Sequence, residues 1–87
     1  MPETASQICV HVRLFASYRE AAGTSRIDTP VSRGARVSDL IDALAVNLPA
    51  LRSARGLIAV NHAYVKADHV LKDGDEVALI PPVSGGR

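Results

Sequence analysis

The sequence predicts a single α+β domain over residues 1–87, in which one main helix covers one face of a mixed sheet. The expected elements run strand, short helix, strand, long helix, hairpin and strand, and the long helix has the clearest amphipathic pattern. A chain of 87 residues is near the lower end of what folds alone, so its apolar residues must serve one core. Because 47% of the residues are hydrophobic but only 3% are aromatic, that core is built from Val, Leu, Ile and Ala. A two-layer arrangement buries the apolar stripe of the helix against the sheet.

The first part of the chain is expected to form two strands around a short helix. Apolar and polar residues alternate from Ile8 to Leu14, which is the period of a half-buried strand. Good helix formers at 16–22 precede Gly23, which favours a short helix ended by glycine. A second strand is predicted from Arg26 to Val31, and Pro30 marks it as an edge strand or a strand end because proline cannot donate to the ladder.

The main helix is predicted to begin at the N-cap Ser38 and to stop near Pro49. Asp39 and Asp42 place negative charge in its first turn, where the helix dipole favours it. Apolar residues follow at helical spacing: Val37, Leu40, Ile41, Leu44 and Leu48. This stripe is the face that we expect the sheet to cover.

The last part of the chain is expected to form a hairpin and a final strand. The hairpin comprises a strand over 57–60, a turn over 61–63 and a return strand over 64–66. A strong turn signal at 72–75 then precedes the last strand, Glu76 to Ile80.

Charge and composition exclude several function classes. The formal net charge is +1, and the basic residues are scattered, without the stripe that binds a nucleic-acid backbone. No apolar run is long enough to span a bilayer, and the N-terminal stretch MPETASQ lacks the features of a signal peptide. The single cysteine, Cys9, cannot form an internal disulfide. These features predict a cytoplasmic protein that binds neither nucleic acid nor a membrane.

No catalytic or metal-binding motif is present in the sequence. His11, His62 and His69 do not have the spacing of metal ligands, and we expect surface histidines without functional neighbours. Cys9 has no neighbouring histidine motif, which favours an incidental cysteine over a nucleophile. The charged residues in turns, including 73–76, are expected to be solvated. We therefore expect neither a metal nor a cofactor.

Two apolar residues fall outside the predicted core pattern. Phe15, the only Phe, follows a strand whose core face ends at Leu14, so it points away from the core or lies at the strand exit. Ile80 is out of phase with Leu79 on the last strand. If the first and last strands are parallel neighbours, Phe15 and Ile80 meet on the sheet face away from the helix, which is typical of a protein interface. The pattern equally allows Phe15 to cap the core.

The chain ends in PPVSGGR, and we expect residues 81–87 to form a flexible tail. Pro81 and Pro82 end the strand and favour an extended exit. The next four residues, Val83 to Gly86, could extend by roughly 13 Å at about 3.3 Å per residue, which reaches a pocket in another protein. The Gly-Gly pair has no side chains, so that pocket can be a narrow tunnel.

Three stretches together resemble the MoaD/ThiS family of sulfur carriers: VRLFASYREAAGT (12–24), AVN (59–61) and above all DGDEVALIPPVSGG (73–86). The likeness runs from about Val10 to Gly86 and is strongest to the branch that serves molybdopterin synthesis. The resemblance implies a ubiquitin-like β-grasp fold, with the first and last strands parallel in the middle of the sheet.

The resemblance also implies a chemistry for Gly86. An E1-like enzyme of the MoeB type adenylates its carboxylate with ATP, and a sulfur donor protein converts it to a thiocarboxylate. The tail then enters a large subunit of the MoaE type, in a heterotetramer, which turns precursor Z (cyclic pyranopterin monophosphate) into molybdopterin. The implied contact residues are Phe15, Ile80, Pro81, Pro82, Val83, Ser84 and Gly85. Catalytic side chains would belong to the partners.

Arg87 departs from the family pattern, because Gly86 then has no free carboxylate. Either Arg87 is a remnant of cloning, or a peptidase removes it before activation. Three alternatives stay open: a sulfur carrier for thiazole, cysteine or a secondary metabolite; a ubiquitin-like modifier that joins Gly86 to lysines; and an interaction module with an inert tail.

Overall fold

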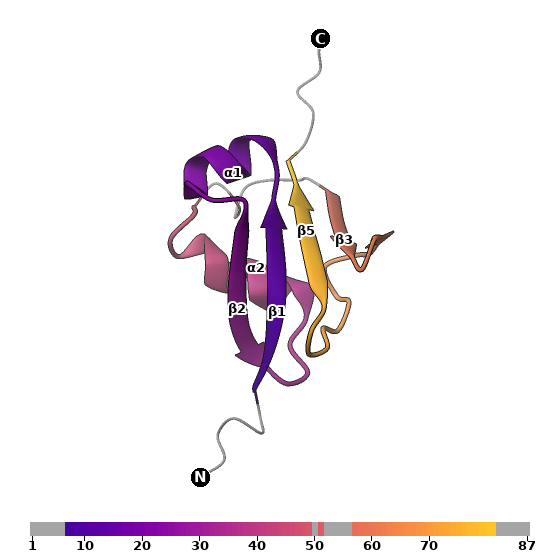
Figure 1. Cartoon of the computed structure of the whole chain (residues 1–87). Helices are drawn as coiled ribbons and strands as arrows, with labels where there is room; N and C mark the ends of the chain where they lie inside the picture. The colour runs from indigo at the N-terminus through magenta and orange to yellow at the C-terminus, as the bar shows by residue number, and fades with distance from the viewer. Residues whose placement is uncertain (1–6, 50, 52–56, 82–87) are drawn as a thin grey trace.

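A five-stranded mixed sheet with one main helix against it forms the fold in the computed structural model, which describes residues 7–49, 51 and 57–81 (Figure 1). The elements are β1 (Gln7–Leu14), α1 (Ala16–Ala22), β2 (Arg26–Ser32), α2 (Val37–Ala45), β3 (Leu57–Val60), β4 (Ala63–Tyr64) and β5 (Glu76–Ile80). The strand order β2-β1-β5-β3-β4 places the parallel pair β1 and β5 in the middle. The predicted α+β class and the parallel central pair are confirmed.

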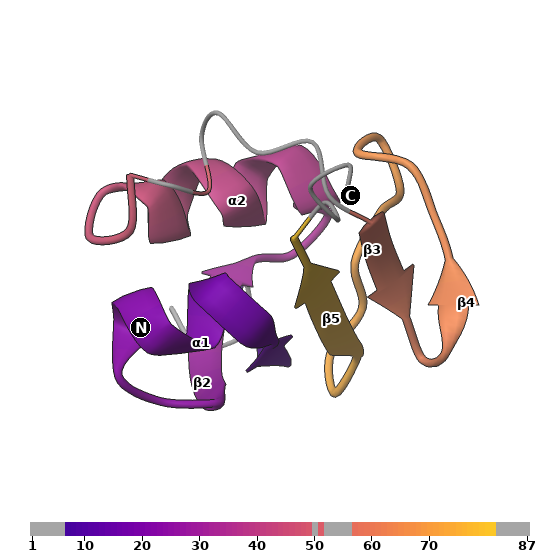
Figure 2. The ribbon, with the colours of Figure 1, turned by 90° about the horizontal axis from the view of Figure 1, so that it is seen from above.

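The core lies between α2 and one face of the sheet. Figure 2 shows α2 on one side of the strands, and in Figure 1 α1 lies at the edge where the β1 arrow ends. The largest fully buried side chains are Leu14, Leu40, Leu71, Val10, Val12, Val37 and Val77. The alternation along β1 therefore buries the residues that the sequence predicted.

Two local predictions from the first part of the chain are also confirmed. Gly23 ends α1 with a left-handed φ of 78°, and its N–H donates to the Arg19 carbonyl at 2.9 Å. Strand β2 is an edge of the sheet, and it contains Pro30. Because proline has no N–H, it interrupts the row of donors along this edge and disfavours pairing with another chain.

The predicted N-cap of the main helix is wrong. Ser38 lies inside α2, and the N-cap is Arg36. The N–H groups of Val37 and Ser38 donate to the carbonyls of His69 and Ala67, both at 2.9 Å. A loop distant in sequence thus accepts the first two N–H groups of α2, and Asp39 Oδ2 accepts the N–H of Arg36 at 2.9 Å, so the N-cap lies two residues before Ser38.

Two further boundaries differ from the predictions. Helix α2 ends at Ala45 rather than near Pro49, although the backbone continues to turn there. Strand β4 is Ala63–Tyr64 rather than 64–66, because the turn holds two residues instead of three. Those residues, Asn61 and His62, both have a left-handed φ, 51° and 74°, as the tightest hairpin turns require.

Asp75 corrects the expectation that the charged residues at 73–76 are solvated, because it is buried. Its carboxylate accepts the side-chain N–H of Asn61 at 2.9 Å and the backbone N–H of Lys72 at 2.8 Å. The Asn61 carbonyl oxygen in turn accepts the backbone N–H of Glu76 at 3.0 Å. These contacts join the β3–β4 turn to the start of β5, so the AVN and DGDE stretches meet for a structural reason.

The Asp75→Ala variant is expected to lower the free energy of unfolding by about 1 to 3 kcal/mol, because two donors lose their acceptor in a partly buried site. Urea unfolding followed by circular dichroism measures this loss. The matched control is Asp68→Ala, which removes an exposed carboxylate and should change stability by less than about 0.5 kcal/mol. Equal losses in the two variants would contradict the role given to the Asp75 contacts.

Candidate functional site

The sheet face opposite α2, here called the outer face, carries the candidate site. The parallel pairing of β1 and β5 sets His11 beside Glu76 and Arg13 beside Ala78. The antiparallel pairing of β3 and β5 sets Ala59 beside Ala78. Since side chains alternate along a strand, these residues share the face away from the core.

Phe15 and Ile80 come together on the outer face, as the sequence predicted. They line a shallow hollow of about 280 Å³ with Arg13, Ala59, His62, Tyr64, Glu76 and Ala78. Phe15 follows the last residue of β1, and Ile80 is the last residue of β5, so the parallel pairing brings both to the same end of the two central strands. Phe15 is 37% exposed and lies outside the core cluster. The alternative that Phe15 caps the core is therefore not favoured.

Leu57 and Tyr64 extend the apolar surface around the hollow, and the sequence analysis did not single them out. Leu57 pairs with Ile80, and Tyr64 pairs with Ala59, which places both on the outer face. They are 54% and 71% exposed. The signal that could have found Leu57 is its phase, because it alternates with Ile58, which is partly buried and packs against the core. Exposed apolar residues gathered in this way are typical of a protein interface.

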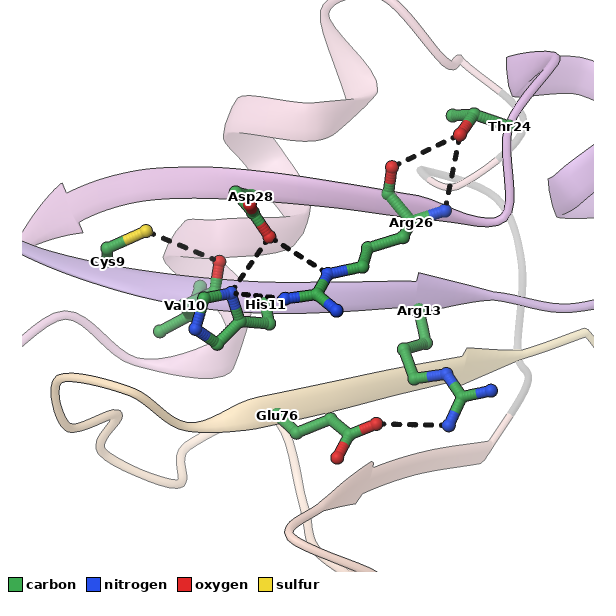
Figure 3. Close-up of polar contacts among 8 residues, drawn as sticks. All are labelled: Cys9, Val10, His11, Arg13, Thr24, Arg26, Asp28 and Glu76. Atoms are coloured by element: carbon green, nitrogen blue, oxygen red, sulfur yellow. Dashed lines mark hydrogen bonds and ion pairs between the residues drawn. The ribbon is translucent and has the colours of Figure 1, made fainter.

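Arg13 joins the apolar and the charged parts of the outer face. Its guanidinium carbon lies 5.6 Å from the centre of the Phe15 ring, within the range of a cation–π contact. Its Nη1 donates to Glu76 Oε2 at 3.1 Å, as Figure 3 shows. His62 Nε2 lies 4.0 Å from the other oxygen of Glu76. The sequence places Arg13 on the polar face of its strand but gives no sign of these partners.

His11 lies on the polar face of its strand, as expected, and has charged neighbours that the sequence analysis did not identify. Its Nδ1 lies 2.8 Å from Asp28 Oδ1, and the same oxygen accepts a hydrogen bond from Arg26 Nε at 3.1 Å (Figure 3). The hydrogen bonds from His11 and Arg26 hold the pKa of Asp28 below its usual value. The group is solvent-exposed, so it adds little to stability and instead gives the outer face a polar region beside the hollow.

Cys9 is exposed on β1, and its backbone has a structural role. Its N–H donates to Asp73 Oδ1 at 2.8 Å, and its carbonyl accepts the N–H of Gly74 at 2.8 Å.

Within residues 7–49, 51 and 57–81, no three His, Cys, Asp or Glu residues are grouped to hold a metal ion. No helix in this part of the chain is long and apolar enough to cross a bilayer.

Most of the predicted tail lies outside the described residues. Pro81 is half-buried and directly follows β5. The positions outside the described residues are Pro82, Val83, Ser84, Gly85, Gly86 and Arg87. Because β5 ends at Ile80, the tail starts at the wall of the hollow.

Comparison with known families and sequences gives a match over almost the whole chain. The ThiS family model matches residues 12–86. A molybdopterin synthase sulfur carrier subunit from Chlamydomonas reinhardtii is 41% identical over 81 residues, which cover 88% of this chain and 98% of that protein. A protein of the same name from Mycobacterium tuberculosis is 43% identical over 82 residues, covering 91% of this chain and 99% of that protein.

Two solved structures share the fold. The structure of small archaeal modifier protein 1 from H. volcanii matches this chain with a TM-score of 0.78 and 30% sequence identity. The match covers 87% of this chain and 99% of the modifier protein. A chain in the complex of subunits 1 and 2 of molybdopterin-converting factor from Helicobacter pylori has a TM-score of 0.65 and 26% identity. This match covers 91% of the present chain and 100% of the Helicobacter pylori chain. Both neighbours support the β-grasp architecture described above.

Proposed function

The chain belongs to the ThiS family, and from this membership we propose that it is the sulfur carrier subunit of a molybdopterin synthase. It carries sulfur as a thiocarboxylate on Gly86 and donates it to precursor Z, which becomes molybdopterin. One observation carries the proposal: the family match continues through the Gly-Gly pair to residue 86. The carrier subunits that are 41% and 43% identical are covered almost from end to end.

The Gly86 carboxylate must be activated before it can accept sulfur. On an E1-like enzyme of the MoeB type, a carboxylate oxygen attacks the α-phosphorus of ATP, which releases pyrophosphate and forms an acyl adenylate. Sulfide, or the terminal sulfur of a persulfide on a donor protein, then attacks the acyl carbon and displaces AMP. Sulfide gives the thiocarboxylate directly. A persulfide gives an acyl disulfide, and a second thiol cleaves its S–S bond, which releases the thiocarboxylate and leaves the donor sulfur in a new disulfide. Adenylation is needed because AMP is a good leaving group, whereas the oxygen of a free carboxylate is not.

The described part of the chain supplies docking for this chemistry. We assign the outer face, with Phe15 and Ile80, to a large subunit of the MoaE type, in a heterotetramer. The related Helicobacter pylori chain is part of a complex of two subunits, which supports a large-subunit partner. A partner held on the outer face lies next to the start of the tail, so sulfur transfer takes place within one assembly without release of the carrier.

The test is reconstitution from purified components. A chain that ends at Gly86 and carries the thiocarboxylate is mixed with the large subunit and precursor Z, and molybdopterin is measured. We expect two carriers to be consumed for each molybdopterin, because the dithiolene holds two sulfur atoms. The same chain with an ordinary carboxylate is the control. A loaded carrier that leaves precursor Z unchanged would favour a carrier for thiazole, cysteine or secondary-metabolite synthesis.

Deletion of Ser84 to Arg87 is expected to abolish sulfur transfer while leaving the melting temperature almost unchanged. The deletion removes the reacting carboxylate, but a terminal segment beyond two prolines has few contacts to lose. Thermal unfolding and the reconstitution assay measure the two effects. The control replaces Ser84 with Ala and keeps the Gly-Gly pair. A large drop in melting temperature on deletion would mean that the tail is packed against the domain and is not a free donor arm.

A ubiquitin-like modifier is the second candidate, favoured by the 30% identity and TM-score of 0.78 to small archaeal modifier protein 1. In that case Gly86 forms an isopeptide bond with a lysine of another protein. Trypsin cleaves after Lys72, so a modified lysine would carry residues 73–86 as its remnant. Mass spectrometry of cell extracts for this remnant separates the two functions, because a carrier used only for sulfur leaves none.

A further inference from the structure

We propose that the hollow on the outer face receives one large, uncharged side chain of the large subunit. The inference rests on the proposed function, since it specifies how that partner docks. The hollow measures about 280 Å³ and is bounded by residues of β1, β3, β4 and β5 together with Phe15 and His62. Sites for small molecules usually measure about 300 to 1,000 Å³. The hollow lies at the lower end of this range, and one large side chain is enough to fill it.

Two alanines account for the hollow. Ala59 on β3 and Ala78 on β5 are directly opposite each other in the ladder, and both line the hollow. The residues around them are larger, namely Phe15, Ile80 and Tyr64. The surface is therefore recessed at the methyl groups of Ala59 and Ala78, and the larger side chains around them form the walls of the hollow. A complementary projection from a partner would bury Ala78 and the surrounding apolar walls and would pack over Ala59, which is already buried in the free chain, as the centre of an interface does.

The charges that line the hollow compensate one another. Arg13 and Glu76 are paired at 3.1 Å, and the Arg13 guanidinium also lies over the Phe15 ring. A charged occupant would have to compete with this pair and lose its own water. An uncharged side chain leaves the pair intact and covers it, so the charges select against charged residues at this position.

Occupation of the hollow would also fix the start of the tail. Ile80 forms part of the wall, and six residues follow it up to Gly86. At about 3.3 Å per residue, these six residues reach at most roughly 20 Å. The sulfur on Gly86 can then react only within that distance of Ile80. A single contact at the hollow would thus raise the effective concentration of the thiocarboxylate at the partner's reaction centre.

The test fills the hollow without removing any contact. In a carrier that ends at Gly86, Ala78→Ile is expected to raise the Kd for the purified large subunit by about tenfold or more, measured by calorimetry. Ala59→Ile fills the same space from β3 and should act alike. The matched control is Ala63→Ile, an exposed β4 position that pairs with the core residue Val60 and lies outside the hollow. Melting temperatures identify any variant that fails to fold.

Loss of affinity in both filling variants, with the control and the melting temperatures unchanged, supports the proposal. Unchanged affinity of a folded Ala78→Ile or Ala59→Ile variant overturns it, while binding and sulfur transfer by the unsubstituted carrier leave the proposed function intact. Failure of the unsubstituted carrier to bind the large subunit would contradict both the proposed occupant of the hollow and the proposed function. A dimer of the carrier alone that Ala78→Ile dissociates would assign the hollow to a second copy, which also overturns the proposal.

Discussion

The double substitution Phe15→Ala, Ile80→Ala is expected to weaken binding to the large subunit by about 2 to 4 kcal/mol while the fold stays cooperative. Both side chains line the hollow on the outer face, and Phe15 is exposed rather than part of the core. Truncation of apolar anchors at the centre of an interface costs free energy on this scale. Calorimetry with the purified large subunit gives the affinity, and thermal unfolding of the free carrier gives the stability.

The matched control for this variant removes two exposed apolar side chains elsewhere. Val46, at the end of α2, and Val70, which bridges to Arg36, are 73% and 43% exposed. Val46→Ala, Val70→Ala should leave the affinity within about 0.5 kcal/mol of the unsubstituted chain. If the Phe15 and Ile80 variant binds the large subunit as tightly as the unsubstituted chain, the outer face is not part of the interface. If that variant unfolds, Phe15 contributes to the core instead.

Much of the fold follows from local pattern. The alternation from Ile8 to Leu14 gives both the strand and its buried face, because every second side chain points to the same side. The same reasoning sets Phe15 and Ile80 out of phase with the core, and the parallel pairing of β1 with β5 then brings them together. The parallel pairing itself was expected from the resemblance to β-grasp carriers, because alternation alone does not specify which strands are neighbours.

The polar contacts that complete the fold depend on residues far apart in the sequence. Asp75 looks like an ordinary turn residue, and only the folded chain brings Asn61, 14 positions away, to its carboxylate. Arg13 and Glu76 are separated by 63 positions. The start of α2 was misplaced for the same reason, because backbone carbonyls at 67–69 replaced the expected serine cap. Local pattern carries no information about such partners.

The hollow could not be predicted from the sequence, because its shape depends on which side chains lie next to each other on neighbouring strands. An alanine in a strand gives no signal of its own, and the depth of the surface at Ala59 and Ala78 depends on which residues stand beside them across four strands. The tail presents the opposite case, since its composition is informative without any structure. Glycine pairs are nevertheless common, so the proposal of a thiocarboxylate on Gly86 depends on the resemblance from about Val10 to Gly86.

Removal of Arg87 is expected to switch on sulfur loading that the longer chain does not support. Activation needs a free carboxylate on Gly86, and the peptide bond to Arg87 occupies that carboxylate. If the pocket that receives the tail is a narrow tunnel, as the Gly-Gly pair allows, the arginine also places a bulky cation where that tunnel closes. Chains that end at Gly86 and at Arg87 are each incubated with ATP, a MoeB-like enzyme and a sulfide source, and intact masses are recorded. We expect the mass of a thiocarboxylate, one oxygen replaced by sulfur, on the shorter chain alone.

The control for this comparison is a chain that ends at Gly85, which has a free glycine carboxylate but a tail one residue shorter. If the activating enzyme positions the carboxylate by the length of the tail, this chain should load far more slowly than the chain that ends at Gly86. Recovery of the Gly86-ended form from native cells would show that a peptidase removes Arg87 before activation. Efficient loading on Arg87 itself would show that a Gly-Gly terminus is not required. Absence of loading on every form would leave an interaction module, because a carrier that cannot form a thiocarboxylate has no sulfur to deliver to the outer-face partner.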